Sequence, residues 1–526
     1  MLKGGILTPC SWLQTPNSFV FLQFEKIIVE DKREVSYSHV LKYTGIFGGV
    51  QGLNILIGLV RNKVVASLLG PAGMGLAALF NSVVNFISQA TNLGISFSAV
   101  RHVSELFDAG DEARIQHFVK VVRAWSLLTA LMGMLVCMLA GPLLSAYTFA
   151  WGDHTLHFVL LAPAVGLMAV TGGETAILKG ARRLKSLAII QLLSVLLALV
   201  ISVPIYYFFG EAGIVPVIVL MALALALATS YHSLRLYPLQ LHGAKGILGE
   251  GMEMVRLGVA FVLAGIFGSG AEMLIRSYLN VTGDLDVVGL YNAGFLLTIT
   301  YAGMVFSAME TDYFPRLSGV AADRLRMSET VNRQIEVSLL LVSPMLAVLM
   351  LLLPVLVPLL FRSDFLPMVP MAQVMVFSMY LRAVTLPISY MVLARGDSLA
   401  FLLIEGSESL LMVALIVLGY EHWGLLGTGI AIDATYVLDL IIVYAYTHMR
   451  YGYRGTLPVL LIAAIQVPLG VVVYLLTLLA GGLLYWALGA LVCMVSLTVS
   501  IYILHQKSSL WKALTEKLRS RFHADA

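Results

Sequence analysis

The sequence has few cysteines and few charged residues for its length. Three cysteines occur in 526 residues, and Cys10, Cys137 and Cys493 lie far apart, so no disulfide framework or metal-binding spacing is present. Charged residues make up 12% of the chain, about half of the roughly 25% in an average soluble domain. The sequence also lacks a P-loop, zinc-type histidine spacing and a nucleophile elbow. We therefore expect no enzyme and no cofactor.

Hydrophobic residues dominate instead, at 59% of the chain with a mean hydropathy of +0.90. About fourteen apolar stretches each reach the roughly 20 residues that a transmembrane helix needs. The sequence therefore predicts an all-α polytopic membrane protein. The expected spans are roughly 42–68, 73–97, 121–146, 156–178, 187–209, 213–232, 257–280, 288–311, 335–360, 367–393, 399–419, 424–447, 457–479 and 483–504.

Lys and Arg occur mainly in every second connection between these stretches. The 182–185 connection is basic, for example, whereas Asp153 and Asp284 lie in connections of the opposite set. Basic cytoplasmic loops are the rule in membrane proteins, so both termini are predicted to be cytoplasmic. The net charge of +3 follows from this topology and does not indicate a nucleic-acid partner.

An internal repeat divides the chain into similar halves. The segment around Arg61 is echoed around Arg276, and further echoes follow in the same order at an offset of about 215 residues. Six spans in each copy give both halves the same membrane orientation. We expect five regions: a cytoplasmic N-terminal extension (1–40), two six-helix halves (41–235 and 250–449), two additional transmembrane helices (455–505) and a cytoplasmic basic tail (506–526). Repeated bundles of this kind are typical of transporters that work by alternating access.

The first helical hairpin carries a more specific signal. The run from Arg61 to Leu76, RNKVVASLLGPAGMGL, is followed by Leu93-Gly94-Ile95 and by Arg101-His102-Val103-Ser104-Glu105. This pattern resembles the first hairpin of bacterial Wzx-type O-antigen and common-antigen flippases. These flippases belong to the polysaccharide transporter family of the multidrug/oligosaccharidyl-lipid/polysaccharide (MOP) exporter superfamily.

The resemblance implies a fold like that of the multidrug and toxic compound extrusion (MATE) transporters, in the bacterial inner membrane. It also implies a function: moving an undecaprenyl-pyrophosphate-linked oligosaccharide from the cytoplasmic to the periplasmic leaflet. The glycan would be an O-antigen, common-antigen or capsule repeat unit. A glycan polymerase and a chain-length regulator are the protein partners that such a function implies.

Four cations within the spans are candidates for binding the pyrophosphate. Arg61 and Lys63 lie near the outer end of the first span, Arg276 has the corresponding place in the seventh, and Arg382 lies in the middle of the tenth. A charge within a span is costly and usually has a task or a partner, and Arg suits bidentate phosphate contact. In the alternative reading they reach the headgroup region or form ion pairs, with Glu272 as the intrahelical partner of Arg276.

A polar stripe in the second span is the candidate sugar-binding surface. Asn81, Asn85, Gln89, Asn92 and Ser96 are spaced by four, four, three and four residues, so they share one face of a helix. Such a stripe can line a wetted cavity, or it can join two helices through hydrogen bonds. The sequence favours the cavity and leaves the second reading open.

Acids in the later spans are candidates for coupling transport to an ion gradient. Asp433 and Asp439 in the twelfth span are the preferred pair, and Glu405 and Glu408 occur in the eleventh. Structural ion pairing is the alternative reading. At the level of function, a cation-coupled multidrug exporter of the same fold is the runner-up, and a membrane scaffold or a glycan polymerase is a third class. The sugars, the coupling ion and the oligomeric state stay open.

Overall fold

The computed structural model describes residues 18–149, 152–239, 247–479 and 482–507, and within these ranges it contains helices and no strand. The chain divides into two compact units, residues 1–54 and 55–526. Of the smaller unit, residues 18–54 are described, and they are helical. Ten described segments are long and apolar enough to cross a membrane. The predictions of an all-α chain and a multi-pass membrane protein are confirmed, whereas the basic tail beyond residue 507 lies outside the described residues.

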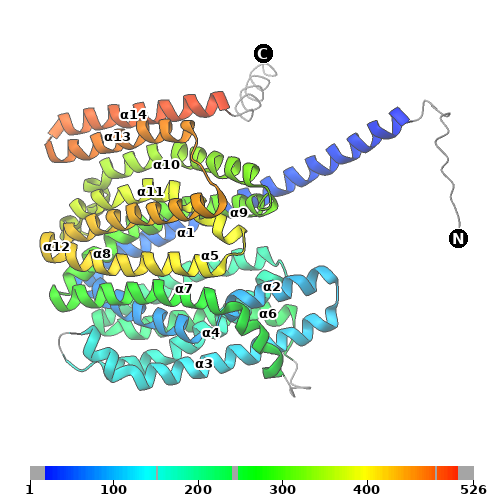
Figure 1. Ribbon diagram of the computed structural model, residues 1–526. Coiled ribbons are helices and arrows are strands. Elements are labelled where there is room, and N and C mark those ends of the chain that lie inside the picture. The colour runs from blue at the N-terminus through cyan, green and yellow to red at the C-terminus, as the bar shows by residue number, and fades with distance from the viewer. Residues whose placement is uncertain (1–17, 150–151, 240–246, 480–481, 508–526) are drawn as a thin grey trace, which may run out of the picture. The chain divides into compact units, whose positions relative to one another are not determined.

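The helices follow one another with short connections (Figure 1). The first half of the sequence contains α1 (Ser18–Thr91), α2 (Ile95–Ala109), α3 (Glu112–Thr148), α4 (Thr155–Gly180), α5 (Leu184–Phe209), η1 (Gly210–Gly213) and α6 (Ile214–Leu236). The second contains α7 (Ile247–Thr282), α8 (Leu285–Phe295), the π-helical turn η2 (Leu296–Tyr301), α9 (Ala302–Gly319), α10 (Arg324–Leu360), η3 (Ser363–Met368), α11 (Val369–Ala394) and α12 (Ser398–Tyr451). Helices α13 (Leu457–Leu479) and α14 (Gly482–Lys507) complete the chain.

Two of the longest helices are interrupted at a glycine. Helix α1 breaks at Gly70 and α12 at Gly424, where φ is +66° and +57°. Glycine is favoured there because a Cβ atom disfavours positive φ. Residues 398–423 are called here the first arm of α12, and 425–451 its second arm. The arms pack on each other, since a Cβ atom on Gly427 would lie 2.4 Å from the carbonyl carbon of Gly419. These breaks agree with the expected span boundaries, and the count of fourteen spans stays a prediction.

Helix α2 was not expected from the sequence. The second span was predicted to run to about residue 97, but the helix ends at Thr91 and a separate helix begins at Ile95. Gly94 lies between them with φ +73°. Gly94 packs against Gly258 of α7 so closely that a Cβ atom on Gly94 would lie 2.7 Å from the Cα atom of Gly258. The apolar run continues through this bend, so hydropathy alone does not reveal it.

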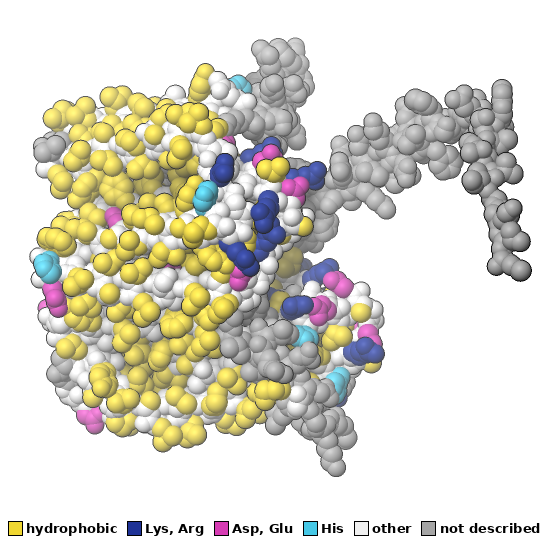
Figure 2. All heavy atoms as spheres, in the orientation of Figure 1, with side chains coloured by type: hydrophobic (Ala, Val, Ile, Leu, Met, Phe, Trp, Pro, Cys, Tyr) yellow, Lys and Arg dark blue, Asp and Glu magenta, His cyan; other side chains and the backbone are white. Residues whose placement is uncertain are grey.

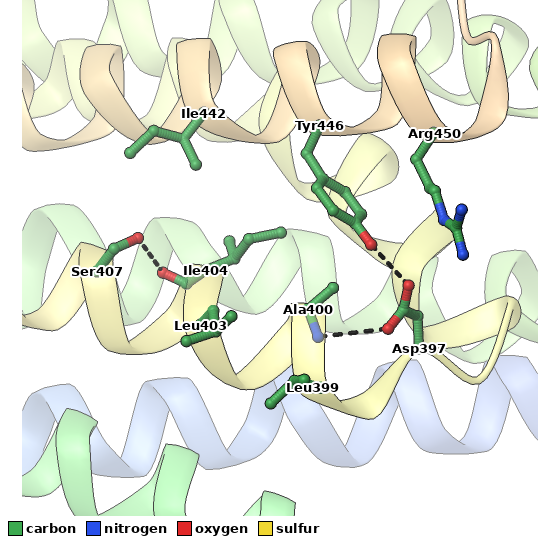
Figure 3. A pocket seen from close by; sticks show the side chains of 9 residues that line it. All are labelled: Asp397, Leu399, Ala400, Leu403, Ile404, Ser407, Ile442, Tyr446 and Arg450. Atoms are coloured by element: carbon green, nitrogen blue, oxygen red, sulfur yellow. Dashed lines mark hydrogen bonds between the residues drawn. The ribbon is translucent and has the colours of Figure 1, made fainter.

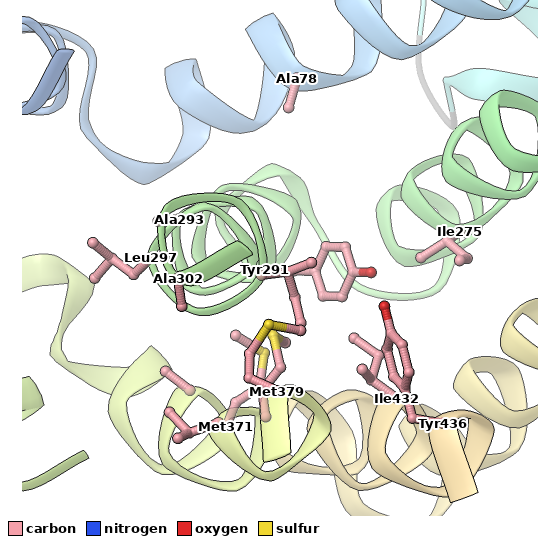
Figure 4. Close-up of a cluster of buried hydrophobic side chains, with 14 of the residues drawn as sticks. Ala78, Ile275, Tyr291, Ala293, Leu297, Ala302, Met371, Met379, Ile432 and Tyr436 are labelled. Carbon is pink, nitrogen blue, oxygen red and sulfur yellow. The ribbon is translucent and has the colours of Figure 1, made fainter. Parts of the chain in front are cut away.

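Helix α7 packs against helices from both halves of the sequence. It contacts α12 on one side and α2 and α3 on the other, as Figure 1 shows for α12 and α3. Helices α13 and α14 pack together and against α10. A large buried cluster includes Tyr291 of α8 and Leu297 of η2 together with Met371 and Met379 of α11 and Tyr436 of α12 (Figure 4).

The surface has the charge distribution of a membrane protein. Figure 2 shows a broad hydrophobic face with Lys and Arg gathered at one end. The connections at this Arg-rich end carry exposed ion pairs, such as Arg182 with Asp108 and Arg326 with Asp323. Asp153 and Asp284 lie in connections at the opposite end of the helices. The asymmetry agrees with the positive-inside pattern, and the orientation of the termini stays a prediction.

Candidate functional site

Arg61 faces other helices of the first half. Its Nε donates a hydrogen bond to Ser202 Oγ of α5 at 3.2 Å, and its Nη2 contacts Met221 Sδ of α6 at 3.8 Å. The side chain is partly buried and lies close enough to Tyr301 of η2 for an electrostatic interaction. Arg61 therefore reaches inward among helices and does not extend along the outside of α1.

Lys63, two residues further, binds the end of α10. Its Nζ donates to the carbonyl oxygen of Pro358 at 2.8 Å and to that of Phe361. Carbonyl groups in the last turn of a helix lack intrahelical partners and carry partial negative charge, so a cation is stabilised there. This contact gives Lys63 a structural role that links the two halves.

Arg276 is buried in α7 and is paired on its own helix. Its Nη1 contacts Glu272 Oε2 at 2.9 Å, and its Nη2 donates to Asn292 Oδ1 of α8 at 3.3 Å. The intrahelical partner named as an alternative from the sequence is thus present. Arg276 Nε has no hydrogen-bond partner among the described residues. Arg61 and Arg276 share no bonding partner in the described chain, so the structure does not join these two candidate cations directly.

The polar stripe of α1 has mostly exposed side chains. Asn81, Asn85 and Gln89 lie on α1 and are exposed, whereas Asn92 is half-buried and follows the end of α1 at Thr91, and Ser96 belongs to α2. The prediction that all five residues share one face of a single helix is therefore wrong, because the chain bends at Gly94. Asn81 donates to the carbonyl of Ala77 on its own helix, and Asn92 donates to Ser96 Oγ at 3.0 Å. No hydrogen bond joins Asn85 or Gln89 to another described residue. The stripe therefore does not connect α1 to a neighbouring helix through these two side chains.

The stripe faces α7 in an antiparallel arrangement. A Cβ atom on Gly265 would lie 3.6 Å from the amide carbon of Gln89, and one on Gly270 would lie 3.3 Å from the ring of Phe86. Along this contact, residue numbers decrease on α1 while they increase on α7, so the two helices are antiparallel. Continuing in this antiparallel register brings Asn85 to about the level of residues 269–271 and Asn81 to about the level of residues 273–275.

Helix α7 carries its own polar face at this position. Gly265, Ser269, Glu272 and Arg276 are spaced by four, three and four residues, which places them on one side of a helix. Glu272 is 48% exposed, although it pairs with buried Arg276. From the sequence, Glu272 is expected only as a partner of Arg276. The spacing of these four residues could have predicted a second polar surface, on α7, opposite the stripe of α1.

A separate charged group lies in the second half. Arg382 of α11 donates from Nη1 to the hydroxyl of Tyr436 at 3.4 Å. Glu405 and Glu408, on the first arm of α12, interact electrostatically with Arg382. Asp439, on the second arm, interacts with the same three side chains. The ion-pair alternative for Arg382 therefore has suitable acids nearby.

The two preferred acids of α12 are not brought together. Asp439 is 5% exposed and belongs to the group around Arg382, and its Oδ1 has no hydrogen-bond partner among the described residues. Asp433 lies beside the backbone of Ser378 on α11, and its Oδ1 is likewise unpartnered in the described chain. Six residues separate the two acids, which is about 240° around a helix. Glu405 and Glu408, which were not preferred from the sequence, are the acids that share a site with Asp439.

The model of the family described as polysaccharide biosynthesis protein matches residues 64–370. The lipid III flippase of Escherichia coli (strain K12) is 23% identical over 403 residues, covering 72% of this chain and 91% of that protein.

Solved structures show the same fold. An inward-facing multidrug resistance MATE family transporter of the MOP superfamily has a TM-score of 0.63 at 16% identity, covering 76% of this chain and 94% of that chain. The lipid II flippase MurJ in an inward closed conformation has a TM-score of 0.55 at 14% identity, covering 88% and 99%.

Proposed function

Since the chain belongs to the polysaccharide biosynthesis protein family, we propose that it is a flippase that moves a lipid-linked oligosaccharide across a membrane by alternating access. The resemblance to Wzx-type flippases of the MOP superfamily, first seen in the hairpin that follows Arg61, is confirmed. The proposal extends it to the substrate: an undecaprenyl-pyrophosphate-linked repeat unit that enters from the cytoplasmic leaflet and leaves in the periplasmic leaflet.

The observation that carries this proposal is the pair of facing polar surfaces on α1 and α7. Gln89 lies against α7 of the other half, Asn85 is one turn away on the same face of α1, and neither amide has a hydrogen bond to another described residue; Glu272 is exposed on α7. A hydrated glycan needs hydrogen-bonding groups along its path through about 30 Å of hydrocarbon. Polar side chains at the contact of two halves supply them, and rocking of the halves would expose them to each side in turn.

Arg61 and Arg276 supply the cationic groups that the pyrophosphate of such a substrate requires. Arg276 belongs to the α7 polar face, and Arg61 lies among helices of the other half. A guanidinium group binds phosphate through two parallel hydrogen bonds, and Arg276 has an unpaired Nε available. We assign the pyrophosphate to these two residues. Lys63 is assigned a structural role because its ammonium already binds two carbonyl groups.

The acids around Arg382 are proposed to couple transport to an ion gradient. Buried carboxylates that share a site with an arginine can exchange a proton or a cation as the packing of their helices changes. Glu405, Glu408 and Asp439 lie on the two arms of α12, so a change in the spacing of the arms alters their mutual repulsion. Asp433 is the second candidate and lies apart from this group.

Deletion of the gene in its native host tests the function. We expect loss of surface glycan and accumulation of the lipid-linked oligosaccharide in the cytoplasmic leaflet, both restored by a plasmid copy. Unchanged glycan with raised sensitivity to cationic dyes would instead favour a multidrug exporter. The orientation is tested by single cysteines, since an impermeant reagent should label position 284 and not position 183 in intact cells.

A further inference from the structure

A groove lies between the two arms of α12, and its lining includes no residue of α1 or α7. Its volume is about 500 Å³, within the range of small-molecule sites of about 300 to 1,000 Å³. Charged side chains stand at one end and mainly apolar side chains along the rest, as Figure 3 shows. The lining residues are Asp397, Leu399, Ala400, Leu403, Ile404, Ser407, Ile442, Tyr446 and Arg450.

The charged end of the groove holds one acid and one base. Asp397 accepts hydrogen bonds from the hydroxyl groups of Tyr446 at 2.6 Å and Tyr451 at 3.2 Å, and from the backbone N–H of Ala400. The bond from Tyr446, with smaller contributions from Ala400 and Tyr451, holds the pKa of the Asp397 carboxyl below its usual range, so this group stays ionised. Arg450 is exposed beside it. The two charges are close enough to interact and form no ion pair within 4.0 Å.

The apolar part of the groove has the length of one membrane leaflet. Ten residues separate Asp397 from Ser407, which is about 15 Å of helix at about 1.5 Å per residue. A hydrocarbon core of about 30 Å has leaflets of about this depth. Leu399 and Leu403 are 67% and 64% exposed, whereas Ala400 and Ile404 form the buried floor. The groove therefore begins at the headgroup level of the Arg-rich end and stops near the membrane centre.

We propose that this groove binds one phosphatidylethanolamine molecule of the leaflet at the Arg-rich end, with its ammonium at Asp397, its phosphate at Arg450 and one acyl chain along Leu403, Ile404 and Ile442. A zwitterionic headgroup matches an acid and a base that lie side by side without pairing. The acyl chain contributes by burying its CH₂ groups against these apolar side chains.

The headgroup chemistry makes the site selective. The ammonium of phosphatidylethanolamine can donate hydrogen bonds to the Asp397 carboxylate, and charge-assisted bonds of this kind are strong. Phosphatidylcholine carries the same phosphate and charge but has three methyl groups in place of the N–H donors. Phosphatidylglycerol has no cation for Asp397. We therefore expect the binding affinity to decrease from phosphatidylethanolamine to phosphatidylcholine to phosphatidylglycerol when the acyl chains are the same.

Native mass spectrometry of the full-length protein with these three lipids, matched in acyl chains, tests the proposal. Phosphatidylethanolamine should bind about tenfold more tightly than phosphatidylcholine, a factor equivalent to about 1.4 kcal/mol. Asp397→Asn should remove this preference and still cap the helix, because Asn is also a favourable N-cap residue. Arg450→Gln should weaken binding of all three lipids.

A matched pair of tryptophan variants tests the acyl-chain position. Leu403→Trp fills the groove and should abolish binding, whereas Leu410→Trp, at a leucine of similar exposure on the same arm outside the groove, should leave it unchanged. Equal binding of the three lipids, or equal effects of the two tryptophans, would overturn the proposal. Because the readout is lipid binding, either result leaves the flippase proposal to its own test.

Discussion

Lys63 of α1 donates a hydrogen bond to the carbonyl oxygen of Pro358 in the last turn of α10 at 2.8 Å, across 295 residues of sequence. A cation at a helix C-terminus stabilises it by about 0.3 to 1 kcal/mol, and by up to about 2 kcal/mol when partly buried. Lys63→Met should therefore lower the free energy of unfolding in detergent by about 1 kcal/mol. Lys185→Met, at an exposed lysine in the first turn of α5, is the control and should not lower it, because a cation near a helix N-terminus is not stabilised by the helix dipole. Loss of glycan display at unchanged stability would return Lys63 to the substrate site.

Arg61 and Arg276 should both be needed for transport. Arg61→Ala and Arg276→Ala should each abolish surface glycan at unchanged protein level, because each removes a pyrophosphate contact. Lysine at either position should restore display only partly, since the two-pronged guanidinium contact is lost. Ser202→Ala, which removes the hydrogen-bond acceptor of Arg61 and keeps the charge, should leave display intact. Normal glycan in both alanine variants contradicts the assignment.

The polar stripe of α1 should be reachable from water. Cysteines at Asn85 and Gln89 should react with a small water-soluble thiol reagent, because these side chains are exposed and have no hydrogen bond to another described residue. A cysteine at Val84, which is 1% exposed, is the control and should stay unreactive. Asn85→Leu should leave stability unchanged. If the stripe instead joined helices, that variant would lose about 0.6 kcal/mol, the average for interhelical polar contacts.

The acids around Arg382 should govern the dependence of transport on an ion gradient. Asp439→Asn and Glu408→Gln should remove most of the stimulation by an imposed proton or sodium gradient in vesicles, because each deletes a charge from the shared site. Asp433→Asn should retain that stimulation, since Asp433 lies on another face of α12. The assignment to Asp439 fails if only the Asp433 variant loses gradient dependence.

Asp397 should contribute to acid sensitivity. Hydrogen bonds from Tyr446, Ala400 and Tyr451 lower the pKa of its carboxyl in the folded state. The resulting stability is fully present above the unfolded pKa of about 3.9 and is lost as the pH falls through the lower folded pKa. The difference in thermal midpoint between the wild type and Asp397→Asn should therefore be larger at pH 6 than at pH 3. A difference that does not change with pH would argue against an ionised Asp397 in these contacts.

Several features of the site could be predicted because they depend on local periodicity. The spacing of Asn81, Asn85 and Gln89 indicates a single helical face, and the structure leaves those side chains exposed. The same rule applied to Gly265, Ser269 and Glu272 would have revealed the opposite wall on α7. The separation of Asp433 and Asp439 by six residues also predicts that they lie on different faces of one helix.

The sequence by itself determined the class of protein and its helical composition. Long apolar runs can satisfy their backbone groups in lipid only as helices, and this requirement acts on each segment separately. Only the tertiary structure decided which residues distant in the sequence lie together: Lys63 with the carbonyl of Pro358, Gln89 with the backbone at Gly265, and Asp439 with Glu405 and Glu408. Lipid is as apolar as the helix surfaces, so hydropathy does not specify the partner of a helix. Close packing and polar contacts between helices specify it, and these depend on side chains that lie up to hundreds of residues apart.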